Sequence, residues 1–326
     1  QGVVTERVLV TGGAGFIGSH VCEQLLRQGR SVRVLDDLST GSRENLAAAG
    51  VSDRDFVLGS IVDADTVQRA MQGCSKVVHL AALPSVARSV EAPLETHLAC
   101  ATGTLTVLDA ARRAKSRVVY AGSSSAYGNQ EALHKQEGMR EDPLSPYAAA
   151  KFAGELYCRT FARVYGLQVV VTRFFNVFGP RQTADSPYSG VVAAFCRSLL
   201  LGKSPRFDGD GLQSRDFTYV EDVVLGVLRC LDGNTPGCET VNLAYGQATT
   251  IQDLYQELGR IAQRCLGLQT IPEPQMAPPR AGDVRHSLAD VTRARELFGF
   301  APQLGFAKGL QKTFDWYRES GRSTLV

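Results

Sequence analysis

The stretch VLVTGGAGFIGSH, residues 8–20, decides the fold. A β-branched run leads into a glycine-rich turn, and a helical pattern follows it. Gly13, Gly15 and Gly18 fit the spacing G-x-G-x-x-G, and Gly12 with the last two fits G-x-x-G-x-x-G. Such glycines permit a tight turn and let a pyrophosphate approach the free amides at the start of a helix. We therefore predict a strand–turn–helix unit that binds a dinucleotide.

Short apolar strands alternate with helical patterns through the first half of the chain. We expect the strands at 7–12, 31–37, 54–59, 76–82, 116–122 and 167–174, and helices at 15–28, 63–72, 92–114 and 146–165. Continuous apolar strands separated by helices are typical of a parallel sheet that is covered on both faces. The pattern predicts an α/β protein with a Rossmann-type, doubly wound parallel sheet.

The second half of the chain is less regular. We expect helices within 189–202 and at 221–231, 250–265, 291–298 and 306–319, and strands at 215–220 and 238–244. No repeat and no low-complexity linker separates the halves, which indicates two interleaved domains. Residues 1–174 with about 216–245 are predicted to form the nucleotide-binding domain. Residues 175–215 and 246–326 are predicted to form a smaller C-terminal α/β domain for the substrate.

Composition excludes several classes of function. The 326 residues are 44% hydrophobic and 21% charged with a net charge of +2, which gives no support for binding to nucleic acid or to a membrane surface. No apolar run approaches the roughly 18 residues of a membrane span, and the first residues enter a strand without a leader pattern. The eight cysteines are scattered without a C-x-x-C pair. They predict reduced thiols in a cytoplasmic protein and no metal site.

An acidic residue ends the second predicted strand, about twenty residues after the glycine-rich turn. Asp36 stands where a carboxylate binds the adenosine ribose hydroxyls of a dinucleotide. Its negative charge repels a 2′-phosphate, so the sequence favours NAD over NADP.

A tyrosine and a lysine follow the fifth predicted strand. Tyr147 and Lys151 are four residues apart, which places them on one face of the predicted helix. A phenol titrates near pH 10, too high for a base at neutral pH. A nearby lysine cation and an oxidised nicotinamide favour the phenolate, so we expect Lys151 to lower the pKa of Tyr147.

These motifs together resemble the extended short-chain dehydrogenase/reductase family, in its nucleotide-sugar epimerase branch. The resemblance runs through TGGAGFIGSH, VVHLAALPSV, SSSAYG, YAAAK, RFFNVFGPRQ, SRDFTYVEDV and RAGDVRHSLAD. It implies a Rossmann domain that binds NAD, a C-terminal domain that binds a UDP-sugar, and a homodimer joined through two helices of each subunit.

The resemblance also implies a set of site residues. Tyr147 would be the general base, Lys151 would bind the nicotinamide ribose, and Ser123, counted back from Gly128, would be the third catalytic residue, with Ser124 beside it. The cofactor residues would be Gly12, Gly15, Phe16, Ile17, Gly18, Asp36, Asp37, Ser60, Ile61, Leu80, Ala81, Ala82, Cys100, Tyr147, Lys151 and Phe174. The substrate residues would be Ser85, Val86, Ser123, Ser125, Tyr147, Asn176, Arg181, Gly190, Val191, Arg206, Phe207, Arg215, Arg280, Asp283 and Ser287.

Two positions depart from the family pattern. Ser60 stands where the family often has an aspartate near the adenine, and Cys100 stands where it often has an asparagine. Neither belongs to the catalytic set, so the expected reaction class is unchanged.

The serine loop bears on the reaction. Related 4,6-dehydratases and uronate decarboxylases carry an acidic residue in this loop, where this chain has Ser124, Ser125 and Ala126. A serine does not supply the proton chemistry of a carboxylate at neutral pH. We therefore expect 4-epimerisation through a transient 4-keto sugar.

The preferred sugar follows from the resemblance. Ser287 stands where epimerases of plain hexoses often have tyrosine, which leaves room for a 2-acetamido group. UDP-GlcNAc/UDP-GalNAc is therefore expected, with UDP-Glc/UDP-Gal possible. The alternatives are a UDP-glucuronate or UDP-N-acetylglucosaminuronate 4-epimerase, with Arg88 or Arg181 meeting the carboxylate, and a non-catalytic NAD-binding regulator. Glucuronate epimerases usually carry threonine at Asn176, which counts against the first alternative.

Overall fold

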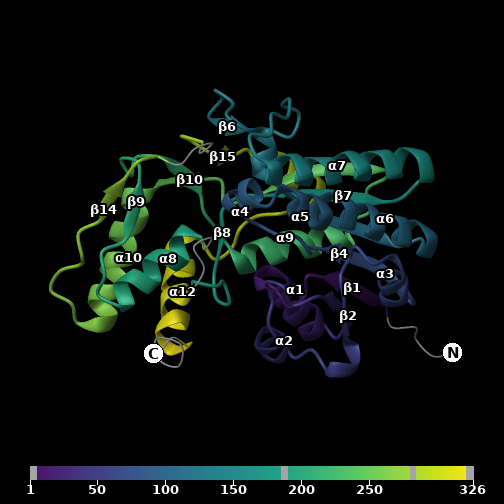
Figure 1. Cartoon of the computed structure of the whole chain (residues 1–326), viewed down its shortest axis with the longest axis horizontal. Coiled ribbons are helices and arrows are strands. Elements are labelled where there is room, and N and C mark those ends of the chain that lie inside the picture. The colour runs from purple at the N-terminus through teal and green to yellow at the C-terminus, as the bar shows by residue number, and fades with distance from the viewer. Residues whose placement is uncertain (1–5, 185–189, 280–283, 321–326) are drawn as a thin grey trace.

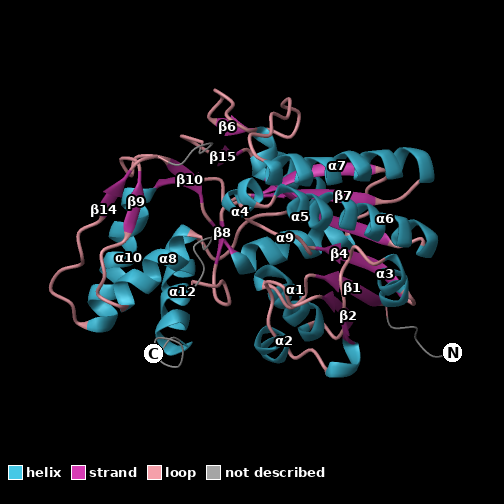
Figure 2. Ribbon diagram, in the orientation of Figure 1, coloured by secondary structure: helices cyan, strands magenta, loops and turns pink. Residues whose placement is uncertain are grey.

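A parallel sheet forms the centre of the protein. The computed structural model describes residues 6–184, 190–279 and 284–320. Seven parallel strands are ordered β12-β7-β5-β4-β1-β2-β3, which confirms the predicted Rossmann-type sheet (Figure 2). Their bounds are β1 Arg7–Thr11, β2 Ser31–Asp36, β3 Phe56–Leu58, β4 Cys74–His79, β5 Arg117–Ser123, β7 Val169–Phe174 and β12 Cys238–Leu243.

Both faces of this sheet are buried. Val8 and Val10 of β1 belong to one apolar cluster with helices α1 (Phe16–Arg27) and α9 (Val220–Asp232). Leu9, between them, belongs to a second cluster with α3 (Ala64–Met71), α6 (Gly103–Ala114) and α7 (Pro146–Tyr165). Since successive side chains of a strand point to opposite faces, burial of both faces explains why the strands read as continuous apolar runs.

A second group of elements lies beside the sheet, at the left of Figure 1. Its helices are α8 (Val191–Leu200), α10 (Ile251–Leu266) and α12 (Phe306–Ser320), while α11 (Thr292–Phe298) packs on β12. Short strands form four two-stranded sheets, which pair β10 (Ser214–Asp216) with β13 (Ala248–Thr250), β11 (Thr218–Tyr219) with β8 (Val177–Phe178), β14 (Gln275–Ala277) with β9 (Arg206–Asp208), and β15 (Leu288–Ala289) with β6 (His134–Lys135). The domain boundaries stay a prediction.

The helices differ from the expectation at three places. The helix expected at 92–114 consists of α5 (Pro93–His97), a π turn at Leu98–Thr102 and α6. Helices α2 (Arg43–Ala49) and α4 (Val86–Glu91) were not expected, and short 3₁₀ turns cover Asp53–Asp55 and Ser124–Tyr127. Both unexpected helices are too short to give a clear periodic pattern of apolar residues. Each begins at a serine cap, Ser42 for α2 and Ser85 for α4.

The eight cysteines are all free thiols, and six of them are buried. Within the described ranges, no helix is long and apolar enough to cross a membrane.

Candidate active site

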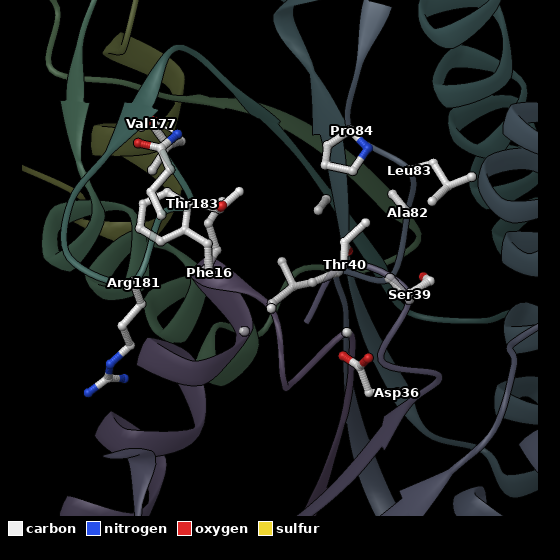
Figure 3. Close-up of a pocket in the computed structure, with 18 of the residues that line it drawn as sticks. Phe16, Asp36, Ser39, Thr40, Ala82, Leu83, Pro84, Val177, Arg181 and Thr183 are labelled. Carbon is white, nitrogen blue, oxygen red and sulfur yellow. Dashed lines mark hydrogen bonds between the residues drawn. The ribbon is translucent and has the colours of Figure 1, made fainter. Parts of the chain in front are cut away.

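A cavity of about 1270 Å³ lies at the carboxyl ends of the strands of the main sheet. In Figure 3, Asp36, Ser39, Thr40, Ala82, Leu83 and Pro84 lie on one side of it, and Phe16, Val177, Arg181 and Thr183 lie on the other. The expected site residues that line the cavity are Gly12, Gly15, Phe16, Ile17, Gly18, Asp36, Asp37, Ser60, Ile61, Leu80, Ala81, Ala82, Ser123, Ser124, Tyr147, Lys151, Phe174, Asn176, Arg181 and Gly190. Most of the residues expected from the sequence to form the site therefore line one cavity.

Other expected residues lie outside this lining. Ser85 caps α4 by accepting a hydrogen bond from the Arg88 amide at 3.1 Å, and Val86 begins that helix. Val191 begins α8 directly after Gly190. Arg280 and Asp283 lie outside the described residues.

Three more of these residues have partners within the second group of elements. Phe207 is buried and stacks on Phe195, with ring centroids 5.3 Å apart. Arg206 pairs with Asp208 at 2.7 Å, and Arg215 donates to the carbonyl of Ser214 at 2.8 Å.

Ser287 also lies outside the lining. Its amide donates to the Ser214 carbonyl at 3.2 Å. This contact ties the segment before β15 to β10, and it does not place the serine hydroxyl against a sugar.

The glycine-rich turn forms a cradle that side chains would fill. Gly12 has φ +70°, and a Cβ there would lie 2.7 Å from the Ala81 amide nitrogen. A Cβ on Gly18 would lie 2.1 Å from the Gly12 carbonyl oxygen. Helix α1 begins after Gly15 with no side-chain cap, so its first amides are left for a ligand. This arrangement fits the pyrophosphate of a dinucleotide.

The end of the cavity around Asp36 is acidic and polar. Asp36 accepts hydrogen bonds from the Ala14 amide at 2.9 Å and the Leu38 amide at 2.8 Å. Burial raises the pKa of Asp36, and these two hydrogen bonds lower it. Five neighbouring residues that were not expected also line the cavity: Ser39, Thr40, Ser42, Glu44 and Asn45. The polar run after Asp37 was the signal that could have found them.

The three serines have different positions. Ser123 ends β5, and its Oγ accepts hydrogen bonds from the Ser125 amide at 3.2 Å and the Ser125 hydroxyl at 2.7 Å. Ser123 also shares a hydrogen bond with Tyr147. Ser124 lines the cavity, whereas Ser125 lies outside the lining and holds Ser123 through the two hydrogen bonds from its amide and hydroxyl.

The environment of Tyr147 differs from the expectation. Burial raises the pKa of this phenol, the Cys100 thiol raises it further, and the hydrogen bond with Ser123 lowers it. Burial outweighs the other effects on the Tyr147 pKa in this structure, and the lowering expected from Lys151 with an oxidised nicotinamide stays a prediction. Burial also lowers the pKa of Lys151, whose Nζ lies 4.7 Å from the centre of the Tyr120 ring.

Cys100 is fully buried in the π turn and does not line the cavity. It clusters with Ala101, Ala150 and Tyr147. Its position is therefore behind the catalytic candidates, and it does not face the space where a cofactor would lie.

Both arginines considered for a sugar carboxylate already have acidic partners. Arg181 donates to Glu23 of α1 at 2.6 Å and to the Ser19 hydroxyl at 3.4 Å. Arg88 pairs with Glu95 at 3.3 Å. The pair of Arg181 with Glu23 was not expected, because the two residues lie far apart in the sequence.

Residues 8–244 match the model of the family described as "NAD dependent epimerase/dehydratase family". The chain belongs to this family. A UDP-glucose 4-epimerase of Mycolicibacterium smegmatis is 40% identical over 97% of this chain and 100% of the relative. A UDP-N-acetylglucosamine 4-epimerase of Methanobrevibacter ruminantium, solved with UDP-N-acetylmuramic acid, is 34% identical with a TM-score of 0.89 over 97% of this chain and 99% of that one.

The UDP-glucose 4-epimerase of Thermus thermophilus, solved with NAD, is 35% identical with a TM-score of 0.86, over 96% of this chain and 99% of that one. Relatives also include a sugar-nucleotide decarboxylase and a 4,6-dehydratase. The family confirms the expected extended short-chain dehydrogenase/reductase relationship, the enzyme class and the cofactor. The protein is an NAD-dependent epimerase.

Proposed function

We propose that this protein interconverts the C4 epimers of UDP-sugars, with UDP-GlcNAc/UDP-GalNAc as the main pair and UDP-Glc/UDP-Gal as a second. One observation carries the proposal: Ser123, Tyr147 and Lys151 line one cavity, and the loop that begins at Ser123 has serines where an elimination or decarboxylation needs a carboxylate. Epimerases among the relatives support the same reaction.

The cofactor would lie along the glycine-rich turn. Gly12, Gly15 and Gly18 would hold the pyrophosphate, Asp36 the adenosine ribose, and Lys151 the nicotinamide ribose. NAD, when bound, supplies reversible oxidation at C4 of the sugar.

The proton chemistry would belong to Tyr147 and Ser123. Tyr147 takes the proton of the 4-hydroxyl and returns it after the 4-keto sugar has turned within the cavity. Ser123 accepts from Ser125 and shares a hydrogen bond with Tyr147, so its hydroxyl would turn from the phenol to the same sugar oxygen when substrate is bound. The raised pKa of Tyr147 means that the phenolate depends on positive charge, which Lys151 and an oxidised nicotinamide would supply.

The charge pattern favours neutral sugars over uronic acids. Arg181 and Arg88 are held by Glu23 and Glu95, so a sugar carboxylate would have to break an ion pair to reach either of them. The preference for a 2-acetamido group rests on the likeness to the UDP-N-acetylglucosamine 4-epimerase and on Ser287, not on a contact within the cavity.

A product assay on three substrates tests the proposal. Incubation with UDP-GlcNAc is expected to give UDP-GalNAc and incubation with UDP-Glc to give UDP-Gal, with UDP-glucuronate slower than both. Tyr147→Phe is expected to lower kcat by about 10²-fold or more while the melting temperature stays near that of the parent. No conversion of either neutral sugar contradicts the proposal, and faster turnover of UDP-glucuronate favours the uronate alternative. If Tyr147→Phe replaces the parent protein in cells without loss of function, the alternative of a non-catalytic NAD-binding regulator is favoured.

Ser287→Tyr is the matched test of sugar choice. A bulky ring at this position is expected to lower the rate on UDP-GlcNAc several-fold more than the rate on UDP-Glc. Equal effects on both sugars refute a role for Ser287 in the choice.

We also propose a cytoplasmic homodimer, joined through the helices that follow β4 and through α7. Large apolar side chains are exposed along this face, with Leu94 79% and Val164 62% exposed. The reduced cysteines agree with a cytoplasmic protein. Leu94→Glu is expected to give monomers by light scattering, while Leu58→Glu, an exposed residue of β3, is expected to leave the dimer intact. A monomeric parent protein refutes this interface.

A further inference from the structure

A chain of hydrogen bonds crosses the core just below the cavity, and the reaction proposed above does not use it. Thr11 Oγ1 lies 2.6 Å from His79 Nδ1, and His79 Nε2 lies 3.0 Å from Thr104 Oγ1. Thr104 donates to the Cys100 carbonyl at 2.7 Å. The Ala81 amide donates to Thr11 Oγ1 at 3.3 Å. The three linked side chains are at most 1% exposed, so water does not compete for these bonds.

The donor and the acceptor of each of these hydrogen bonds can be assigned. Thr104 uses its hydroxyl hydrogen on Cys100, so it can only accept from His79, which must carry hydrogen on Nε2. Burial and the charge of Lys151 lower the pKa of His79 to about 3, so the ring is neutral and Nδ1 is an acceptor. Thr11 therefore donates to Nδ1 and accepts from the Ala81 amide. All three hydrogen bonds therefore donate in the same direction, from Thr11 of β1 toward the Cys100 carbonyl in the π turn.

The two ends of the chain meet the two halves of the proposed site. Thr11 directly precedes Gly12 of the glycine-rich turn, and Ala81 lines the cavity two residues after His79. At the other end, Cys100 packs in one cluster with Tyr147 and Ala150 of α7. Cys100 lies in the π turn at Leu98–Thr102, and its carbonyl accepts from Thr104 at the start of α6. Such turns are frequent at functional sites.

We propose that His79 is a positioning residue, which fixes the distance between the wall that holds the cofactor and the helix that carries Tyr147. An imidazole fits this place because its two nitrogens face opposite ways and accept on one side while they donate on the other. The expected effect on kcat rests on the proposed function. The expected effect on the rate of NAD release rests only on the family, which binds NAD.

Thr104→Val and Thr104→Ser form the matched test. Valine keeps the shape of threonine but leaves His79 Nε2 and the Cys100 carbonyl without this partner, whereas serine restores the hydroxyl. We expect Thr104→Val to release bound NAD faster by about threefold or more and to lower kcat by about tenfold with KM little changed. Thr104→Ser is expected to stay within about twofold of the parent. The same comparison applies to Thr11→Val and Thr11→Ser.

Thr313→Val is the control for loss of stability alone. Thr313 is fully buried in α12 and donates to the carbonyl four residues earlier, Gly309, at 2.7 Å, as Thr104 does to Cys100. Thr313→Val should lower the melting temperature without changing the rate of NAD release or kcat. If Thr104→Val behaves like this control, the positioning role is refuted. If the parent turns over no UDP-sugar, the proposed function fails, and the NAD release rates still decide the inference.

Discussion

Replacing Arg173 should expose the cost of a buried charge under the serine loop. Arg173 and Glu155 are both fully buried, and the guanidinium donates to this carboxylate through Nε at 3.1 Å and Nη2 at 2.7 Å. Nη2 also donates to Glu141 at 2.6 Å. Arg159 completes the group, 2.8 Å from Glu141 and 3.5 Å from Glu155. Two positive and two negative charges therefore balance.

Arg173→Met leaves Glu155 buried with only the longer 3.5 Å contact to the partly exposed Arg159. Breaking a buried pair in this way costs about 3–5 kcal/mol of the free energy of unfolding. Glu141→Gln should cost only about 1 kcal/mol, because Glu141 is partly exposed and Arg173 keeps Glu155. The double variant Arg173→Met with Glu155→Leu removes both buried charges, so it should recover most of the loss.

Urea unfolding measures these differences, followed by far-UV circular dichroism and by the fluorescence of Trp316, the single tryptophan. NAD is kept at one saturating concentration, because a bound ligand adds to the apparent stability. A loss below about 1 kcal/mol in Arg173→Met would refute the reasoning. So would a double variant that is no more stable than the single one.

Three further predictions concern the site. Gly18→Ala should weaken NAD binding about tenfold or more by calorimetry, because its Cβ would lie 2.1 Å from the Gly12 carbonyl oxygen; unchanged affinity contradicts the cradle. Asp36→Ser should raise the affinity for NADP relative to NAD, and an unchanged ratio of dissociation constants contradicts the role of this carboxylate. Folded His79 has a pKa of about 3, while the unfolded chain takes up a proton near pH 6.5. The free energy of unfolding should therefore fall as pH drops below about 6.5, by about 2 kcal/mol at pH 5 from this residue. His79→Gln should lack that part of the slope in urea titrations at pH 7 and pH 5.

Local sequence patterns predicted the main sheet and its long helices well. The helix expected at 146–165 is found at Pro146–Tyr165, where Ser145 caps the first turn and Gly166 ends the helix with a positive φ. These signals are local, so they need no knowledge of the rest of the fold. By contrast, β6 and β15 have two residues each and exist only because His134 lies against Leu288. No periodicity marks such pairs.

The candidate site could be predicted where its residues stand at the ends of parallel strands. Thr11, Asp36, His79 and Ser123 end four of them, so their neighbours had to meet at one edge of the sheet. Contacts between distant segments could not be predicted. The pairing of Arg181 with Glu23, the burial of Cys100 behind Tyr147 and the partners of His79 all depend on packing.

The position of β12 has a consequence during synthesis. This strand covers the edge of β7, yet 69 residues (175–243) separate the end of β7 from the end of β12. At about 5–20 residues per second, the ribosome needs on the order of 3–14 s to make them. For that time β7 is an open strand edge that can pair with another nascent chain. Protection of this edge by a chaperone, rather than the stability of the finished enzyme, is then expected to limit the yield of folded protein at high expression.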